Sequence, residues 1–285
     1  MLAGPFIRRL GQGWLIVILL ALTSAASAGG ATTVPSPEIE NGFRLMYNLN
    51  FAQAEREFSA FERQHADNPM GPVSEAADLL FSEFQRLGVL ETQFYENDSA
   101  FAARKKLAAD PTVRERFNAA LTQAETLAHA RLTKNPTDHD AMFALTLASG
   151  LRADYLALIE KRNLASLHYA KQASALGNQL LAVHPDCYDA HLASGVSRYL
   201  TGSLAAPLRW LVRLGGANPD KQGGIAELQL TAQRGELLAP FARILLAIAY
   251  VRDKEKTRAL AELDSLRSQF PANPLFAREI ARLDK

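Results

Sequence analysis

The chain has few of the sequence features that mark a disulfide-bonded, a nucleic-acid-binding or a β-sheet protein. Its 285 residues include a single cysteine, Cys187, so no disulfide can form within the chain. Its 31 basic residues are balanced by 30 acidic ones, and a net charge of +1 argues against nucleic acid as the main partner. Runs of alternating β-branched residues are almost absent, which argues against a β-sheet protein.

Motifs for catalysis are also lacking. The sequence has no Gly-x-Ser-x-Gly, no His-Glu-x-x-His and no glycine-rich phosphate loop that follows a strand. The pairs Gly215-Gly216 and Gly223-Gly224 lie in a helical context, so they do not meet the strand requirement of dinucleotide binding. We therefore predict a non-enzymatic protein without a cofactor.

Helix-forming residues, by contrast, are abundant. The chain contains 48 alanines and 43 leucines, so 91 of its 285 residues are among the strongest helix formers. This composition predicts an all-α protein.

The first residues read as a secretion signal. Arg8 and Arg9 precede an apolar run over 14–22, and Ala26-Ser27-Ala28 has the small residues of a cleavage site. The nine-residue run is short against the roughly 20 residues that span a bilayer. We predict a signal peptide over 1–28, a linker over 29–37 and a periplasmic location; the alternative is an uncleaved N-terminal membrane anchor.

Helical hairpins recur along the rest of the chain. Between 240 and 273, small residues alternate with larger apolar ones at two-helix spacing, at Ala247, Tyr250, Ala259 and Leu263, and Pro271 closes the unit. The same pattern occurs in two further places, at Gly42, Ala54 and Phe58 near the start and at Gly195, Tyr199, Gly224 and Leu228 later. Because Pro69 comes three residues late, we expect the helix before it to be one turn longer.

This pattern resembles the tetratricopeptide repeat (TPR), in which a small residue on each helix lets the two helices of a pair approach closely. The resemblance implies a TPR-like solenoid of helical hairpins, a right-handed superhelix over 38–285, with about five helix pairs and a capping helix over 274–283. Two looser pairs fall at 73–88 with 111–134 and at 139–161 with 163–183. Insertions are expected at about 89–110 and 203–218.

In TPR folds the concave groove is lined by the first helix of each pair. The resemblance therefore gives groove candidates that are apolar in all three repeats: Ile39, Phe43, Met46, Tyr47, Leu192, Val196, Tyr199, Leu200, Phe241, Ile244, Ile248 and Val251. Such a groove either binds an apolar guest or is filled from within, and internal filling is the favoured interpretation because an open apolar trough promotes aggregation.

The second insertion contains a short amphipathic helix centred on Trp210. It completes the core, forms a groove wall, or contacts a membrane weakly through Arg209 and Arg213, and we favour the core. Residues 202–228 also resemble a segment of a eukaryotic mitochondrial outer-membrane TPR family linked to inclusion-body clearance. The matching residues are Gly216, Asp220, Gly224, Ile225 and Leu228.

One weak metal candidate remains, formed by His184, Cys187 and His191. Helix-end roles explain these residues better, with Asp186 as the expected cap of the following helix. Taken together, the sequence predicts an exported TPR-type scaffold that binds a protein or peptide. The alternative is a small-molecule or lipid-binding helical protein associated with an envelope transporter, with 203–218 as the roof of its pocket.

Overall fold

The computed structural model describes residues 35–90, 106–204 and 218–285, and every regular element in them is helical. Thr32–Lys285 form one compact unit. The prediction of an all-α fold is confirmed. The eleven α-helices of the described residues are α1 Pro37–Tyr47, α2 Phe51–Gln64, α3 Met70–Arg86, α5 Pro111–Lys134, α6 His139–Asp154, α7 Asn163–Val183, α8 His191–Gly202, α10 Lys221–Arg234, α11 Ala239–Arg252, α12 Lys256–Gln269 and α13 Pro274–Leu283.

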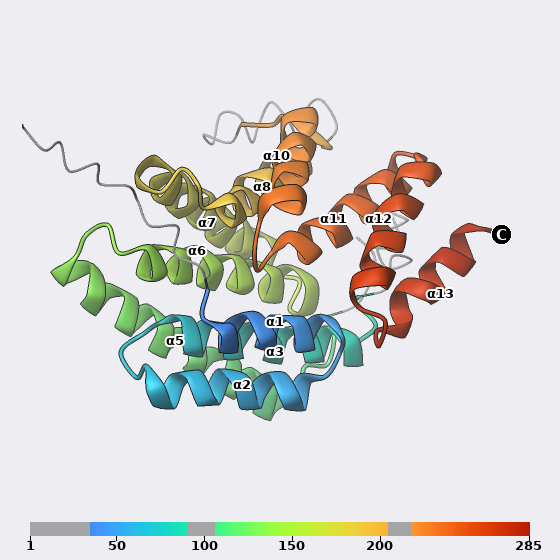
Figure 1. The fold of residues 1–285 in the computed structure, drawn as a ribbon. Helices are drawn as coiled ribbons and strands as arrows, with labels where there is room; N and C mark the ends of the chain where they lie inside the picture. The colour runs from blue at the N-terminus through green and yellow to red at the C-terminus, as the bar shows by residue number, and fades with distance from the viewer. Residues whose placement is uncertain (1–34, 91–105, 205–217) are drawn as a thin grey trace, which may run out of the picture. The chain divides into compact units, whose positions relative to one another are not determined.

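Each helix packs mainly on its neighbours in sequence (Figure 1). The pairs are α1 with α2, α3 with α5, α6 with α7, α8 with α10 and α11 with α12, and α13 follows the last pair. Consecutive pairs are joined by contacts of α2 with α3, α5 with α6, α7 with α8 and α10 with α11. A chain of helical hairpins is therefore the architecture of the described residues.

The turns inside the first and last pairs are the same. Leu49 and Lys254 both adopt a left-handed conformation, with φ of 62°. The next residue then donates its N–H back to the helix, from Asn50 to the Leu45 carbonyl at 2.9 Å and from Glu255 to the Tyr250 carbonyl at 2.8 Å. Because non-glycine residues rarely adopt positive φ, a turn that occurs twice in this form marks a structural repeat.

The turns that leave these two pairs also match, and they correct one prediction. After α2 the Asn68 N–H donates to the His65 carbonyl at 2.9 Å, and after α12 the Asn273 N–H donates to the Phe270 carbonyl at 3.0 Å. Both asparagines accept a bond from the second residue beyond them, each at 2.9 Å. Pro69 thus belongs to the start of α3, and α2 has 14 residues like α12, with no additional turn.

The predicted helices otherwise differ at their ends. The helix expected over 139–161 ends as α-helix at Asp154 and continues as a π-helical turn, Tyr155–Ile159. The helix expected from 187 begins with a 3-10 turn, Tyr188–Ala190, before α8. The expected cap at Asp186 is wrong, because Cys187 occupies the cap position and makes no side-chain cap bond.

Small residues lie where the paired helices cross. A side chain at Gly42 would collide with the Phe58 ring, and one at Gly224 would collide with the backbone of Tyr199 and Gly195. Other residues of the predicted packing set are buried too, with exposures of 0 to 2%: Ala54, Phe58, Leu228, Ala247, Tyr250 and Ala259. Pro271 lies in the turn after α12.

One large hydrophobic cluster joins the first helices to the last. It contains Ile39 and Phe43 of α1 together with Leu263 and Leu266 of α12 and Phe276 of α13. A smaller cluster is formed by α8, α10, α11 and Ala259. The two ends of the described repeat array therefore share a core.

Candidate functional site

The predicted groove of the first repeat lies inside the core. Ile39, Phe43, Met46 and Tyr47 are 1 to 3% exposed. The Tyr47 ring packs against Phe270, with ring centroids 5.4 Å apart. These side chains form part of the interior and present no surface to a partner.

Side chains of the last repeat pack against the groove residues of the first repeat. Phe241 and Ile244, both half-buried, pack against the same cluster. A cavity of about 30 Å³ remains between Met46, Tyr47, Ile244 and Phe276. That volume suits about one water molecule, whereas ligand pockets are commonly 300–1,000 Å³.

Buried hydrogen bonds hold the two ends together. The Tyr47 hydroxyl donates to the Leu237 carbonyl at 3.1 Å, and the Asn273 side-chain amide donates to the Tyr47 carbonyl at 2.9 Å. Desolvation by burial raises the pKa of Tyr47 well above its ordinary value. The hydroxyl therefore stays protonated and remains a donor.

Asp189 makes a second long-range connection that sequence analysis missed. Its carboxylate accepts the N–H groups of Glu236, Leu237 and Leu238 at 2.9 to 3.1 Å, directly before α11. It thereby fixes the turn between α10 and α11, in a neighbouring repeat. Burial raises the pKa of Asp189, and the three N–H bonds oppose that shift.

The base of the second insertion is fixed by an ionic network between α8 and α10. Arg198 contacts Asp220 at 2.5 Å and Glu227 at 2.6 Å. The Asp220 side chain also accepts the Gly223 N–H at 2.9 Å and caps α10. Of the residues matched to the mitochondrial family, Gly224, Ile225 and Leu228 are buried, and Gly216 lies outside the described residues. The described part of this segment therefore has a structural role.

Trp210, with most of the 203–218 insertion, lies outside the described residues, as does the predicted signal peptide. The helices beside the insertion are described. Leu192, Val196 and Ile248 are half-buried, and Tyr199 is buried. Tyr199 belongs to the smaller core, and Leu192 and Val196 pack against it.

The strongest apolar exposure lies on α7 and α8. The large apolar side chains that are exposed in the described residues are Leu164 at 87%, Val183 at 45% and Leu200 at 53%. Of the 21 residues of α7, only Ala173, Gly177 and Leu180 are buried. We call this the α7–α8 surface, defined by Leu164, Val183 and Leu200.

The weak metal candidate is not assembled. Within the described ranges, no group of three or more His, Cys, Asp or Glu side chains could hold a metal ion. The His184 Nε2 contacts the Thr137 carbonyl at 2.8 Å, and the His191 ring stacks on Tyr188. Burial raises the pKa of the Cys187 thiol to about 12, so the thiolate that a metal would need is disfavoured.

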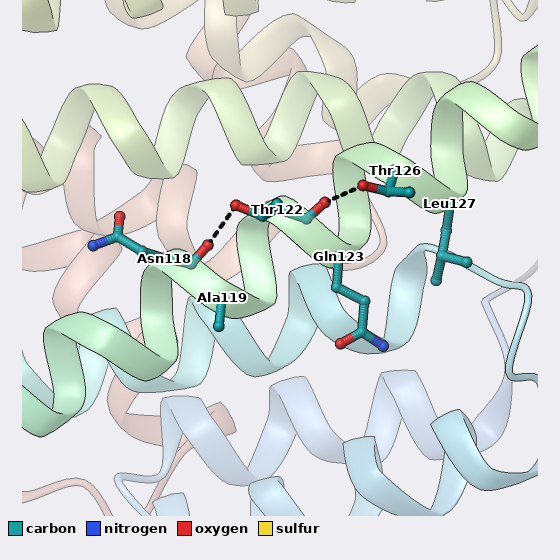
Figure 2. Close-up of a pocket in the computed structure, with 6 residues that line it drawn as sticks. All are labelled: Asn118, Ala119, Thr122, Gln123, Thr126 and Leu127. Atoms are coloured by element: carbon teal, nitrogen blue, oxygen red, sulfur yellow. Dashed lines mark hydrogen bonds between the residues drawn. The ribbon is translucent and has the colours of Figure 1, made fainter.

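A shallow hollow of about 540 Å³ runs along the outer face of α5 (Figure 2). Its described lining comes from that helix alone: Asn118, Ala119, Thr122, Gln123, Thr126 and Leu127. The hydroxyls of Thr122 and Thr126 donate to the carbonyls four residues earlier, at 2.9 and 2.8 Å. The described lining thus has no acid, base or free nucleophile.

One described helical stretch, His139–Ile159, is long and apolar enough to cross a membrane by length and composition. Within the fold it is mostly buried, since 61% of that window is covered by protein. It packs against α5 and α7, which is typical of the core helix of a globular protein.

Comparison of the chain with protein families, with curated proteins and with solved structures found no match.

Proposed function

We propose that this chain is an exported, non-enzymatic scaffold of the TPR type that binds a protein partner in the cell envelope. The observation that carries the proposal is the α7–α8 surface, where Leu164, Val183 and Leu200 are 45 to 87% exposed. Leu164 and Val183 lie at opposite ends of α7, about 28 Å apart along its axis, and Leu200 lies near the end of α8. Other large apolar side chains of the described residues are at least partly buried, and this contrast favours α7 and α8 as the elements that contact a partner.

Among the described residues, the predicted groove of the first repeat offers a partner no accessible apolar surface. Groove positions of the first repeat are 1 to 3% exposed, and the cavity beside them holds about 30 Å³. A small-molecule or lipid carrier needs a chamber about ten times larger. The cavity beside the first repeat is therefore too small for such a ligand, whereas the pocket that 203–218 would roof lies outside the described residues.

The chemistry of α7 indicates the kind of partner. Lys171 is the single Asp, Glu, Lys or Arg residue in this 21-residue helix. The exposed face is mixed, with apolar Leu164, Ala175, Ala182 and Val183 among polar Asn163, His168, Gln172, Asn178 and Gln179. Such a weakly charged, mixed face suits a partner surface that combines apolar contacts with neutral hydrogen bonds and docks with little electrostatic steering. We expect binding to depend weakly on salt.

Crosslinking in cells tests the proposal. A photoreactive amino acid is placed at Leu164 or Leu200 of the full chain, and matched controls carry it at the exposed positions Gln123 on α5 and Thr257 on α12. We expect one discrete crosslinked protein from the first two positions and none from the controls. Equal crosslinking from all four positions would contradict a specific surface.

Export is tested separately on the same full chain. N-terminal sequencing of the protein from a periplasmic fraction is expected to begin at Gly29. An intact N-terminus in the membrane pellet would favour the anchored alternative.

A further inference from the structure

Two polar groups are buried without partners in the centre of α3. Ser74 is 0% exposed and Asp78 is 4% exposed, and they lie one helical turn apart. Neither the Ser74 Oγ nor the Asp78 Oδ1 has a hydrogen-bond partner. Native proteins rarely leave such atoms unsatisfied, so each one calls for an explanation.

The charged side chains around Asp78 leave it without a salt-bridge partner. Arg116 on α5 is the one basic residue that lowers its pKa, and Arg116 is already bound to Glu55 on α2 at 2.5 Å and to Glu75 on α3 at 2.7 Å. Both of those carboxylates oppose ionisation of Asp78. Glu62 on α2 adds a fourth carboxyl, and its own pKa is raised by burial and by Glu75.

The remaining neighbours supply no further charge. Helices α1 and α6 also pack on α3, and neither contributes a group that shifts the pKa of Asp78. Burial is the largest cause of the shift, which raises that pKa to about 8. Asp78 therefore carries a proton at neutral pH, and losing it would place an unpaired charge among three helices.

The ionic contacts of Arg116 lie at the water-facing edge of this junction. The side chains of Arg116, Glu55 and Glu75 are 43, 44 and 25% exposed, whereas Asp78 lies beneath the surface. Separation of α2 or α5 from α3 would let water reach an ionised Asp78. Separation of these helices therefore lowers the free-energy cost of ionising Asp78.

We propose that the junction of α2, α3 and α5 is a proton-dependent latch, which Asp78 keeps shut while it is protonated and loosens when it is ionised. The latch does not depend on the proposed scaffold function, and each can fail without the other. It would adjust the stability of the first repeats to the pH of the surroundings.

Hydrogen exchange on the full chain, corrected for the intrinsic pH dependence of exchange, tests the latch. An opening that releases one proton becomes about tenfold more frequent per pH unit between the pKa of an exposed aspartate, about 4, and that of the closed state. We expect protection of the α2 and α5 amides to fall by about tenfold per unit from pH 5 to pH 8 and then to level off. These amides should also be less protected than those of α11 and α12.

Asp78→Asn, which cannot ionise, should remove the pH dependence in α2 and α5. Asp264→Asn, at a half-exposed carboxylate on α12, is the matched control and should leave it intact. Absence of a pH dependence in the wild type would overturn the latch. So would equal protection in all helices, since only global unfolding would then sense the proton.

If Asp78→Asn fails to fold, carbon-13 NMR of the wild-type aspartate carboxyls decides the issue. The proposal expects the Asp78 carboxyl to be protonated at pH 6.5. A carboxylate already ionised at pH 6 would contradict it.

Discussion

Helices α3 and α7 have similar shares of apolar residues but very different surroundings. In α3, 13 of 17 residues are buried, and the helix packs on α1, α2, α5 and α6. In α7, three of 21 residues are buried, and its main helical partners are α6 and α8. The difference teaches that the number of neighbouring helices, more than composition, decides which apolar helix becomes core and which keeps most of its residues at least partly exposed.

The largest expected effect comes from making the same substitution in both helices. Leu80→Ala in α3 removes a side chain that is 1% exposed and should lower the free energy of unfolding by about 2–5 kcal/mol. Leu164→Ala in α7 removes one that is 87% exposed and should change it by less than about 0.5 kcal/mol. Urea denaturation measures both, and similar losses would show that α7 is covered in solution.

The next largest effect on the free energy of unfolding is expected from larger side chains at the helix crossings. Ala247→Leu or Ala259→Leu introduces volume at positions that are 0% exposed and should cost about 1–3 kcal/mol. Ala175→Leu, on the exposed face of α7, is the matched control and should be nearly neutral. Unchanged thermal unfolding of both core variants would count against the repeat register.

A third effect depends on pH. The folded protein holds the Asp78 proton up to about pH 8, whereas the unfolded chain releases it near pH 4. Within that window this residue lowers stability by about 1.4 kcal/mol for each unit of rising pH, and it adds no slope above or below the window. Asp78→Asn should remove this contribution, so its advantage over the wild type should grow between pH 5 and pH 8 in urea titrations. A constant difference would mean that Asp78 does not titrate there.

Charged substitutions on the α7–α8 surface should have the smallest effect on stability and a specific effect on binding. Leu164→Glu or Leu200→Glu should leave the unfolding midpoint nearly unchanged and abolish the crosslinked product formed from the α7–α8 surface. Gln123→Glu, on α5, is the control for added charge. Retained crosslinking in both leucine variants would remove the basis of the proposed scaffold.

Local rules in the sequence were enough to predict most of the helices. Asp138 caps α6, and its side chain accepts the Ala141 N–H at 2.9 Å. The predicted range 111–134 is that of α5, and 274–283 is that of α13. Caps, prolines and the spacing of small residues act within a few positions along the chain, so a sequence shows them directly.

Only the tertiary structure decided what those helices enclose. Tyr47 was a groove candidate, yet it is buried because its ring packs on Phe81 and on Phe270 of the last repeat. Its hydroxyl donates a hydrogen bond to the carbonyl of Leu237, 190 residues later. The role of Asp189 depends on N–H groups 47 to 49 residues away, and the proton on Asp78 depends on charges from two other helices. Burial and pKa are properties of a three-dimensional environment, and no pattern within one repeat specifies which distant repeat supplies it.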